Sequence, residues 1–169
     1  MTDADMRAVA NLLKSLEPGF LSYPIFEQIA RLVTLPVIEF IPLRQNEERT
    51  EVLLIQRAAD DPFWPDMLHT PGTVIRATDL HRPEDDNWGA FQRILHDELL
   101  DTEVSVPHYV GSIFHASKRG TEQAQLYWIE VMGEPRVGTF YDVTELPASL
   151  IDSQVTFIQQ AAKDFRLRQ

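Results

Sequence analysis

The chain has 169 residues, of which 44% are hydrophobic, and this length and composition fit one globular domain that buries a core. It contains no cysteine, which excludes disulfides and thiolate metal sites. Lys and Arg total 15 against 26 Asp and Glu, a formal net charge of −11 that repels the backbone of a nucleic acid polymer. The same field repels free phosphorylated anions unless a divalent cation bridges them, although net negative charge by itself also serves solubility.

No run of about 18 apolar residues is present, so we expect no membrane-spanning helix. The N-terminal sequence MTDADMRAVANLL begins with acidic residues and lacks the basic region of a secretory signal. A cytoplasmic location is therefore predicted.

The first part of the chain, residues 1–35, predicts a helical extension in front of a single domain over residues 36–169. Apolar side chains recur at helical spacing over residues 4–16 and again over residues 24–33. The Pro-Gly pair at 18–19 separates the two helices. Their apolar stripes could pack on the domain or against a second copy of the chain, so a homodimer is one of two open interpretations.

The rest of the chain alternates between short β-rich runs and helical patterns. Strands are predicted over residues 37–43, 52–57, 73–75, 109–115 and 125–131, and the short segment 140–143 is either a turn or an edge strand. Polar, turn-like segments join the first two runs, and also the fourth and fifth, as in hairpins. Helices are predicted over residues 88–100 and 149–165. Strands interleaved with helices in this way indicate an α/β fold in which helices cover a mixed sheet.

The predicted helix over residues 88–100 carries the most informative pattern. At about 100° per residue, its core face contains Trp88, Phe91, Leu95 and Leu99. A neighbouring strip contains Ile94, Asp97, Glu98 and Asp101, whereas Arg93 and His96 point away. A hard divalent cation needs clustered carboxylates, and Glu98, next to the apolar face, would be partly desolvated and need a partner. A solvated acidic face at a helix end is the competing interpretation.

The stretches HTPGTVIRATD and RILHDELLD resemble the signature of the Nudix hydrolase family. That signature is a Pro-Gly turn, a glycine, five residues, Glu, seven residues, and then Arg-Glu-aliphatic-x-Glu-Glu-x-Gly-aliphatic. Pro71 and Gly72 match the turn, Arg93 matches the motif arginine, and Asp97 and Glu98 match the Glu-Glu pair. Together with the later strands, the resemblance covers residues 37–146.

The chain departs from this signature at several positions. Thr73 stands in place of the glycine, Asp79 in place of the upstream Glu, and Ile94 in place of the first helix Glu. Leu100 and Asp101 replace the last two positions. The loop between the upstream acid and the motif arginine has 13 residues, where the signature has seven.

Similarity to this family implies an α/β/α sandwich that hydrolyses the diphosphate linkage of a small-molecule substrate, a nucleoside diphosphate linked to another moiety. It implies Mg²⁺ or Mn²⁺ as the cofactor, held by Asp97 and Glu98, with Asp79 as an outer ligand or loop anchor. Arg93 would orient the carboxylates by charge-assisted hydrogen bonds. Because Ile94 can neither ligate a metal nor accept a proton, the alternative is a catalytically impaired module that binds a nucleotide or a protein partner.

With an aliphatic residue in that place, the general base must come from elsewhere in the chain. The candidates are Glu122, Glu130, His96, His115 and Asp101. Glu122 is preferred, because the predicted loop that contains it could overhang the site.

Substrate contacts are predicted for three further residues. Arg57 could bind phosphate, Trp64 could stack on a base, and His69 lies beside the Pro-Gly turn. Core packing is the commoner role of such an aromatic, and a turn histidine often has no special role. Arg119 and its neighbour Lys118 could also bind phosphate, but two solvated side chains at a loop tip are the better interpretation.

Overall fold

The computed structural model describes residues 1–80 and 88–168. Within these residues, seven strands form one sheet in the order β3-β2-β1-β6-β5, with β4 paired to β1 and β7 paired to β2. The strands are β1 (Leu35–Asn46), β2 (Arg49–Gln56), β3 (Leu68–His69), β4 (Gly72–Val74), β5 (His108–Ala116), β6 (Thr121–Glu130) and β7 (Thr139–Asp142). Because β1 runs parallel to β6 and antiparallel to β2 and β4, the sheet is mixed, as predicted.

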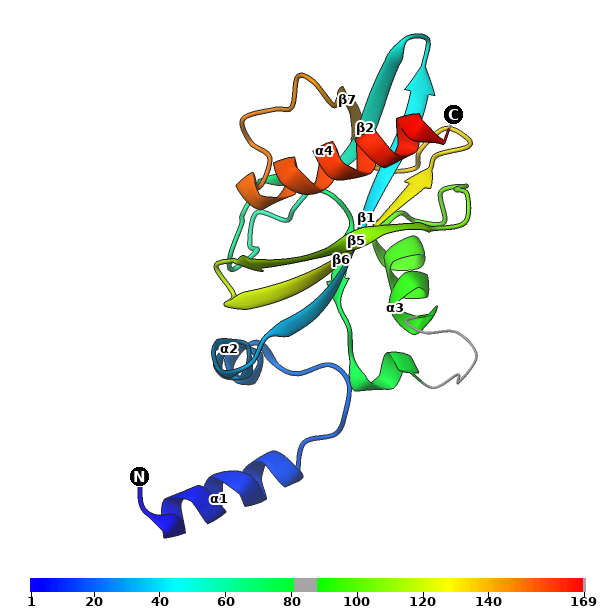
Figure 1. The fold of residues 1–169 in the computed structure, drawn as a ribbon. Coiled ribbons are helices and arrows are strands. Elements are labelled where there is room, and N and C mark those ends of the chain that lie inside the picture. Colours follow the sequence, from blue (N-terminus) through cyan, green and yellow to red (C-terminus); the bar gives the residue numbers. More distant parts are fainter. Residues whose placement is uncertain (81–87, 169) are drawn as a thin grey trace.

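Helices cover both faces of this sheet, which confirms the predicted α/β/α arrangement (Figure 1). The helical elements are α1 (Asp3–Lys14), α2 (Tyr23–Leu32), η1 (Ala77–Leu80), α3 (Trp88–Arg93), the π-helical turn η2 (Ile94–Glu98) and α4 (Asp152–Leu167). On one face, Phe165 of α4 packs in a core with Val37, and on the other, Ile94 of η2 packs with Ile38. Successive residues of β1 thus enter different cores, which is why this strand reads as a nearly continuous apolar run.

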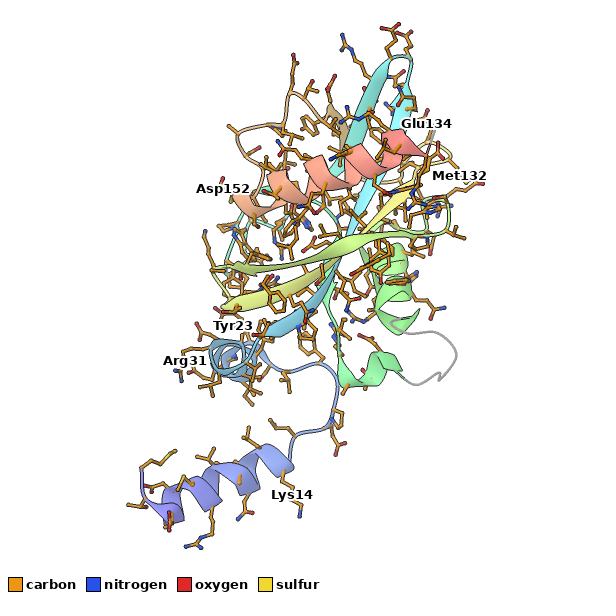
Figure 2. The ribbon with its side chains drawn as sticks, in the orientation of Figure 1. Lys14, Tyr23, Arg31, Met132, Glu134 and Asp152 are labelled. Carbon is orange, nitrogen blue, oxygen red and sulfur yellow. The ribbon has the colours of Figure 1, made fainter. Side chains whose placement is uncertain are left out.

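The N-terminal extension meets the domain through α2 and through the linker before it, where the Arg76 guanidinium carbon lies 5.4 Å from the centre of the Phe20 ring. In Figures 1 and 2, α1 lies apart from the rest of the fold, and none of its residues is buried. Ala30 of α2 is buried, and a Cβ added at Gly120, in the β5–β6 turn, would lie 2.5 Å from its carbonyl oxygen. Only glycine therefore lets this turn approach α2 so closely. No helix in the described parts of the chain is long and apolar enough to cross a membrane.

The predicted helix over residues 88–100 differs from expectation in its second half. The amide of Leu99 donates to the carbonyl of Ile94 (3.0 Å), a π-type hydrogen bond that changes the phase of the helix. Ile94 and Leu99 are both fully buried, so the placement of Ile94 on the acidic strip is wrong. Arg93 does not point away either, since its guanidinium group is bonded to Asp79.

Two predictions concern residues whose structure is only partly described. The side chain of Trp88, which was expected on the core face, lies outside the described residues, as does most of the long acidic loop, residues 81–87. The short strand β3 and the turn η1 were not predicted, because two to four residues are too few for a periodic pattern.

Candidate functional site

A cavity of about 390 Å³ lies where β1, β2, the Pro-Gly turn, η2, the β5–β6 hairpin and the start of α4 meet. Its ionisable lining residues are Glu39, Arg57, Asp61, His69, Asp97, Glu98, His115, Arg119 and Glu122. Of the eight residues predicted for the site, six line this cavity together, and Arg93 and Asp79 do not.

The Pro-Gly turn positions Glu98. The amide of Gly72, the residue after Pro71, donates to Glu98 Oε2 at 3.0 Å. Burial raises the pKa of Glu98 to about 7, although the Gly72 hydrogen bond and the charge of Arg57 act in the opposite direction. Asp97, which is exposed at the edge of the cavity, adds to the rise. A cation next to Glu98 would therefore favour its ionised form.

Arg93 and Asp79 form a separate ion pair that ties α3 to η1. Arg93 donates to both Asp79 oxygens, through Nη2 at 2.6 Å and Nε at 3.1 Å, and also to Thr73 Oγ1 at 2.6 Å. The backbone amide of Arg76 donates to the same carboxylate, and these contacts lower the pKa of Asp79 despite its burial. Both Asp79 oxygens are thus engaged by Arg93 and Arg76, and Asp79 does not line the cavity.

Glu39, in the middle of β1, is a site residue that sequence reasoning missed. It is only 7% exposed, and its Oε2 accepts hydrogen bonds from Thr70 Oγ1 (3.1 Å) and Gln154 Nε2 (3.4 Å). Burial raises the pKa of Glu39 to about 8, and the nearby charge of Glu98 adds to the rise, while Arg119 opposes it. The signal that could have found it is a lone acid inside the apolar run LPVIEFIPL.

Two arginines face the cavity, each already paired with a carboxylate. Arg57 Nη2 lies 2.6 Å from Asp61 Oδ2, and Arg119 Nε lies 2.7 Å from Glu122 Oε1. Their guanidinium carbons lie 5.6 and 5.2 Å from the centre of the Trp64 ring, so the buried indole supports both. Arg119 is thus part of the cavity wall and not a solvated loop tip.

Glu122 is a buried residue of β6, not a loop residue as predicted. Its oxygens accept hydrogen bonds from Arg119 and from Ser117 Oγ (2.6 Å), and His115 Nε2 lies 3.5 Å away. Both ring nitrogens of His115 are buried and lack a hydrogen-bond partner among the described residues. The other candidate bases do not line the cavity, and His96 and Asp101 instead face each other at 3.3 Å on the surface.

His69 is a buried residue that lines the cavity. Its burial and the charge of Arg57 lower its pKa to about 4, so the imidazole is neutral at physiological pH. A neutral ring can donate or accept a hydrogen bond but adds no charge to the cavity.

Three carboxyl groups of the cavity have no cationic partner among the described residues. Glu39, Asp97 and Glu98 form no ion pair with a described residue, whereas Asp61 and Glu122 are neutralised by their arginines. These oxygen donors are the type that Mg²⁺ or Mn²⁺ prefers. In the described part of the chain no three His, Cys, Asp or Glu side chains gather closely enough to hold a metal alone. Mg²⁺ commonly takes one or two carboxylates and completes its coordination with water and substrate phosphates, so the donor set fits a cation shared with substrate.

Comparison with solved structures identifies the fold. No protein-family model matches the sequence, and no curated protein matches it. The Ap4A hydrolase of C. elegans superposes with a TM-score of 0.58 at 12% identity, covering 79% of this chain and 99% of the hydrolase. The Nudix domain of Shewanella oneidensis NrtR, in complex with ADP ribose, superposes with a TM-score of 0.55 at 16% identity, covering 98% of this chain and 99% of that domain.

A third similar structure comes from a complex with a protein. The C-terminal domain of mouse MUTYH, bound to human PCNA, superposes with a TM-score of 0.56 at 13% identity, covering 79% of this chain and 90% of that one. These identities are low, so the similarity shows the fold alone. The chain has the Nudix fold, and the predicted resemblance is confirmed at that level.

Proposed function

We propose that this protein is a divalent-cation-dependent hydrolase that cleaves the diphosphate linkage of a small molecule, a nucleoside diphosphate linked to another moiety. The observation that carries the proposal is the placement of Glu98. Although the signature is incomplete, Glu98 is half-buried and hydrogen-bonded at the Pro-Gly turn, and it lines the same cavity as Arg57 and Arg119.

The charge distribution of the cavity supports a cation. Two arginines, each shared with a carboxylate, cannot offset a diphosphate group that is repelled by Asp97 and by Glu39 and Glu98 in their ionised forms. A divalent ion between Glu98 and the substrate would remove this repulsion. When bound, such an ion polarises a phosphoryl oxygen and lowers the pKa of a coordinated water.

The chain's own residues would bind and orient the substrate. Arg57 and Arg119, held against Trp64, present guanidinium groups to the phosphates, a geometry suited to charge-assisted hydrogen bonds. Glu122 has both oxygens engaged, so it would position Arg119 instead of taking a proton. Arg93 and Asp79 would hold the turn from which Gly72 reaches Glu98.

The test is a screen of small-molecule diphosphates, including ADP-ribose and a dinucleoside polyphosphate, for release of a monophosphate with Mg²⁺ or Mn²⁺. Glu98→Gln should lower kcat at least about 100-fold, because metal stabilisation of a phosphoryl transition state contributes several kcal/mol. Glu145→Gln, on an exposed loop away from the cavity, is the matched control. Equal turnover in wild type and Glu98→Gln would remove Glu98 from the mechanism.

A second candidate function is a Nudix-fold module that binds a nucleotide or a protein partner without hydrolysing anything. Ile94 favours it, because the side chain is fully buried in the core and cannot serve the cavity in place of a carboxylate. Calorimetry separates the two candidates. ADP-ribose binding that is independent of Mg²⁺, with no product after prolonged incubation, would support the binding module over the hydrolase.

A further inference from the structure

Packing does not explain why an acidic side chain occupies position 39. The residue is 7% exposed, and its neighbours on β1, Ile38 and Phe40, are fully buried. No described arginine or lysine forms an ion pair with it. A carboxylate buried without a cation is strongly unfavourable, and an amide or an aliphatic side chain would fill the same place at lower cost.

The hydrogen bonds of Glu39 leave one oxygen available to the cavity. Thr70 and Gln154 both donate to Oε2. The other oxygen, Oε1, accepts no hydrogen bond from the described residues, although the side chain lines the cavity. Glu39 is thus held in one orientation by two neutral donors while Oε1 keeps its capacity to bind a ligand.

Glu39 and Glu98 approach the same glycine from different elements. Glu39 is the register partner of Gly72 in the β1–β4 pairing, and a Cβ built on Gly72 would lie 2.5 Å from Glu39 Oε2 and 2.9 Å from Oε1. The amide of Gly72 donates to Glu98 Oε2 at 3.0 Å. Two unpaired carboxylates this close repel each other unless they share a proton or a cation.

The position of Ile94 shows why a second carboxylate is needed here. In the signature this helix position carries a glutamate, but in this chain the residue is locked into the core between the helix and the sheet. Strand β1, which pairs with β4 after the Pro-Gly turn, supplies a carboxylate to the same cavity.

We infer that Glu39 and Glu98 together hold the divalent cation, with Gly72 between them, and that Glu39 takes the place of the carboxylate lost at Ile94. This inference rests on the proposed function and assigns its cation site. Glu39 is then required for metal binding although it lies outside the signature, about 30 residues before the Pro-Gly turn in sequence order.

The direct test is Mn²⁺ binding to the full chain, followed by electron paramagnetic resonance and by calorimetry without substrate. Glu39→Gln keeps the shape and can still accept both hydrogen bonds, so it should fold with an unchanged or higher Tm. We expect it to weaken Mn²⁺ binding at least about tenfold and to abolish the Mn²⁺-induced rise in Tm. The same loss of Mn²⁺ binding is expected for Glu98→Gln. Glu145→Gln should bind Mn²⁺ like the wild type.

A second variant reaches the same site without removing a carboxylate. Gly72→Ala places a methyl group within 2.5 Å of Glu39 Oε2 and must displace that side chain. It should weaken Mn²⁺ binding while Glu39 is still present. Mn²⁺ affinity in Glu39→Gln equal to that of wild type would overturn the inference and leave the proposed hydrolysis standing. A wild-type protein that binds no Mn²⁺, with or without a diphosphate ligand, would overturn both.

Discussion

Replacing Ile94 by glutamate restores one position of the signature, yet we expect it to destabilise the protein and not to activate it. Ile94 is 0% exposed and packs with Ile38, Phe40 and Ile129 between η2 and the sheet. Loss of this buried apolar side chain lowers the free energy of unfolding by about 1.5–3 kcal/mol. Leaving a carboxyl group there without a partner costs about 1–3 kcal/mol more, even in its neutral form. The total of about 2.5–6 kcal/mol is a large part of the stability of an ordinary domain, roughly 5–15 kcal/mol.

The assay is urea unfolding at neutral pH, monitored by circular dichroism, alongside Mn²⁺ titration of the variant. Ile94→Val is the control, since it removes one methylene from the same place and should cost only about 0.5–1.5 kcal/mol. An Ile94→Glu variant whose free energy of unfolding lies within about 1 kcal/mol of wild type, and which binds Mn²⁺ more tightly, would contradict this prediction. That result would mean that the side chain at 94 can leave the core and enter the cavity.

Two further perturbations test the supports of the site. Asp79→Asn leaves the Arg93 guanidinium group without its carboxylate partner. Because Asp79 is buried, we expect the free energy of unfolding, measured with urea, to fall by about 3 kcal/mol. A loss below about 0.5 kcal/mol would show that the ion pair is dispensable. His69 has a folded pKa of about 4, so between pH 6.5 and 4 the unfolded chain takes up a proton that the folded chain does not. The free energy of unfolding should therefore decrease as the pH is lowered through this window, by at most about 3 kcal/mol from this residue. The charges of Arg57 and Arg119 disfavour the protonated ring, and the charge of Asp61 favours it. His69→Gln should remove that contribution, and stability curves for wild type and variant that stay parallel between pH 7 and 4.5 would contradict it.

The helix over residues 88–100 was predicted correctly in type but wrongly in the orientation of its second half. A wheel with 3.6 residues per turn, taken from the ideal α-helix, placed Ile94 beside the carboxylates. The backbone instead forms a π-turn at Ile94–Glu98, which buries Ile94 and still delivers Glu98 to Gly72. Nothing in local propensity marks such a turn, because packing of the helix against the sheet selects it.

The sequence alone was enough for the longer helices and strands and for the resemblance. Alternating or continuous apolar runs located the β1–β2 and β5–β6 hairpins, helical spacing located α1, α2 and α4, and the Pro-Gly turn with the carboxylates of η2 indicated the fold. Each of these signals lies within a short stretch of chain, where side-chain period and turn chemistry act. Glu39 was visible only as an isolated acid, since its importance depends on residues far away in sequence.

Tertiary structure alone decided which charges share a cavity. The β1–β4 pairing brings Glu39 over Gly72, α4 adds Gln154, and the β5–β6 turn brings Arg119 next to Trp64. The same packing assigned Asp79 to a brace with Arg93 and removed Ile94 into the core. These are long-range contacts, whose partners are chosen by the burial of whole elements, so no local pattern of residues encodes them.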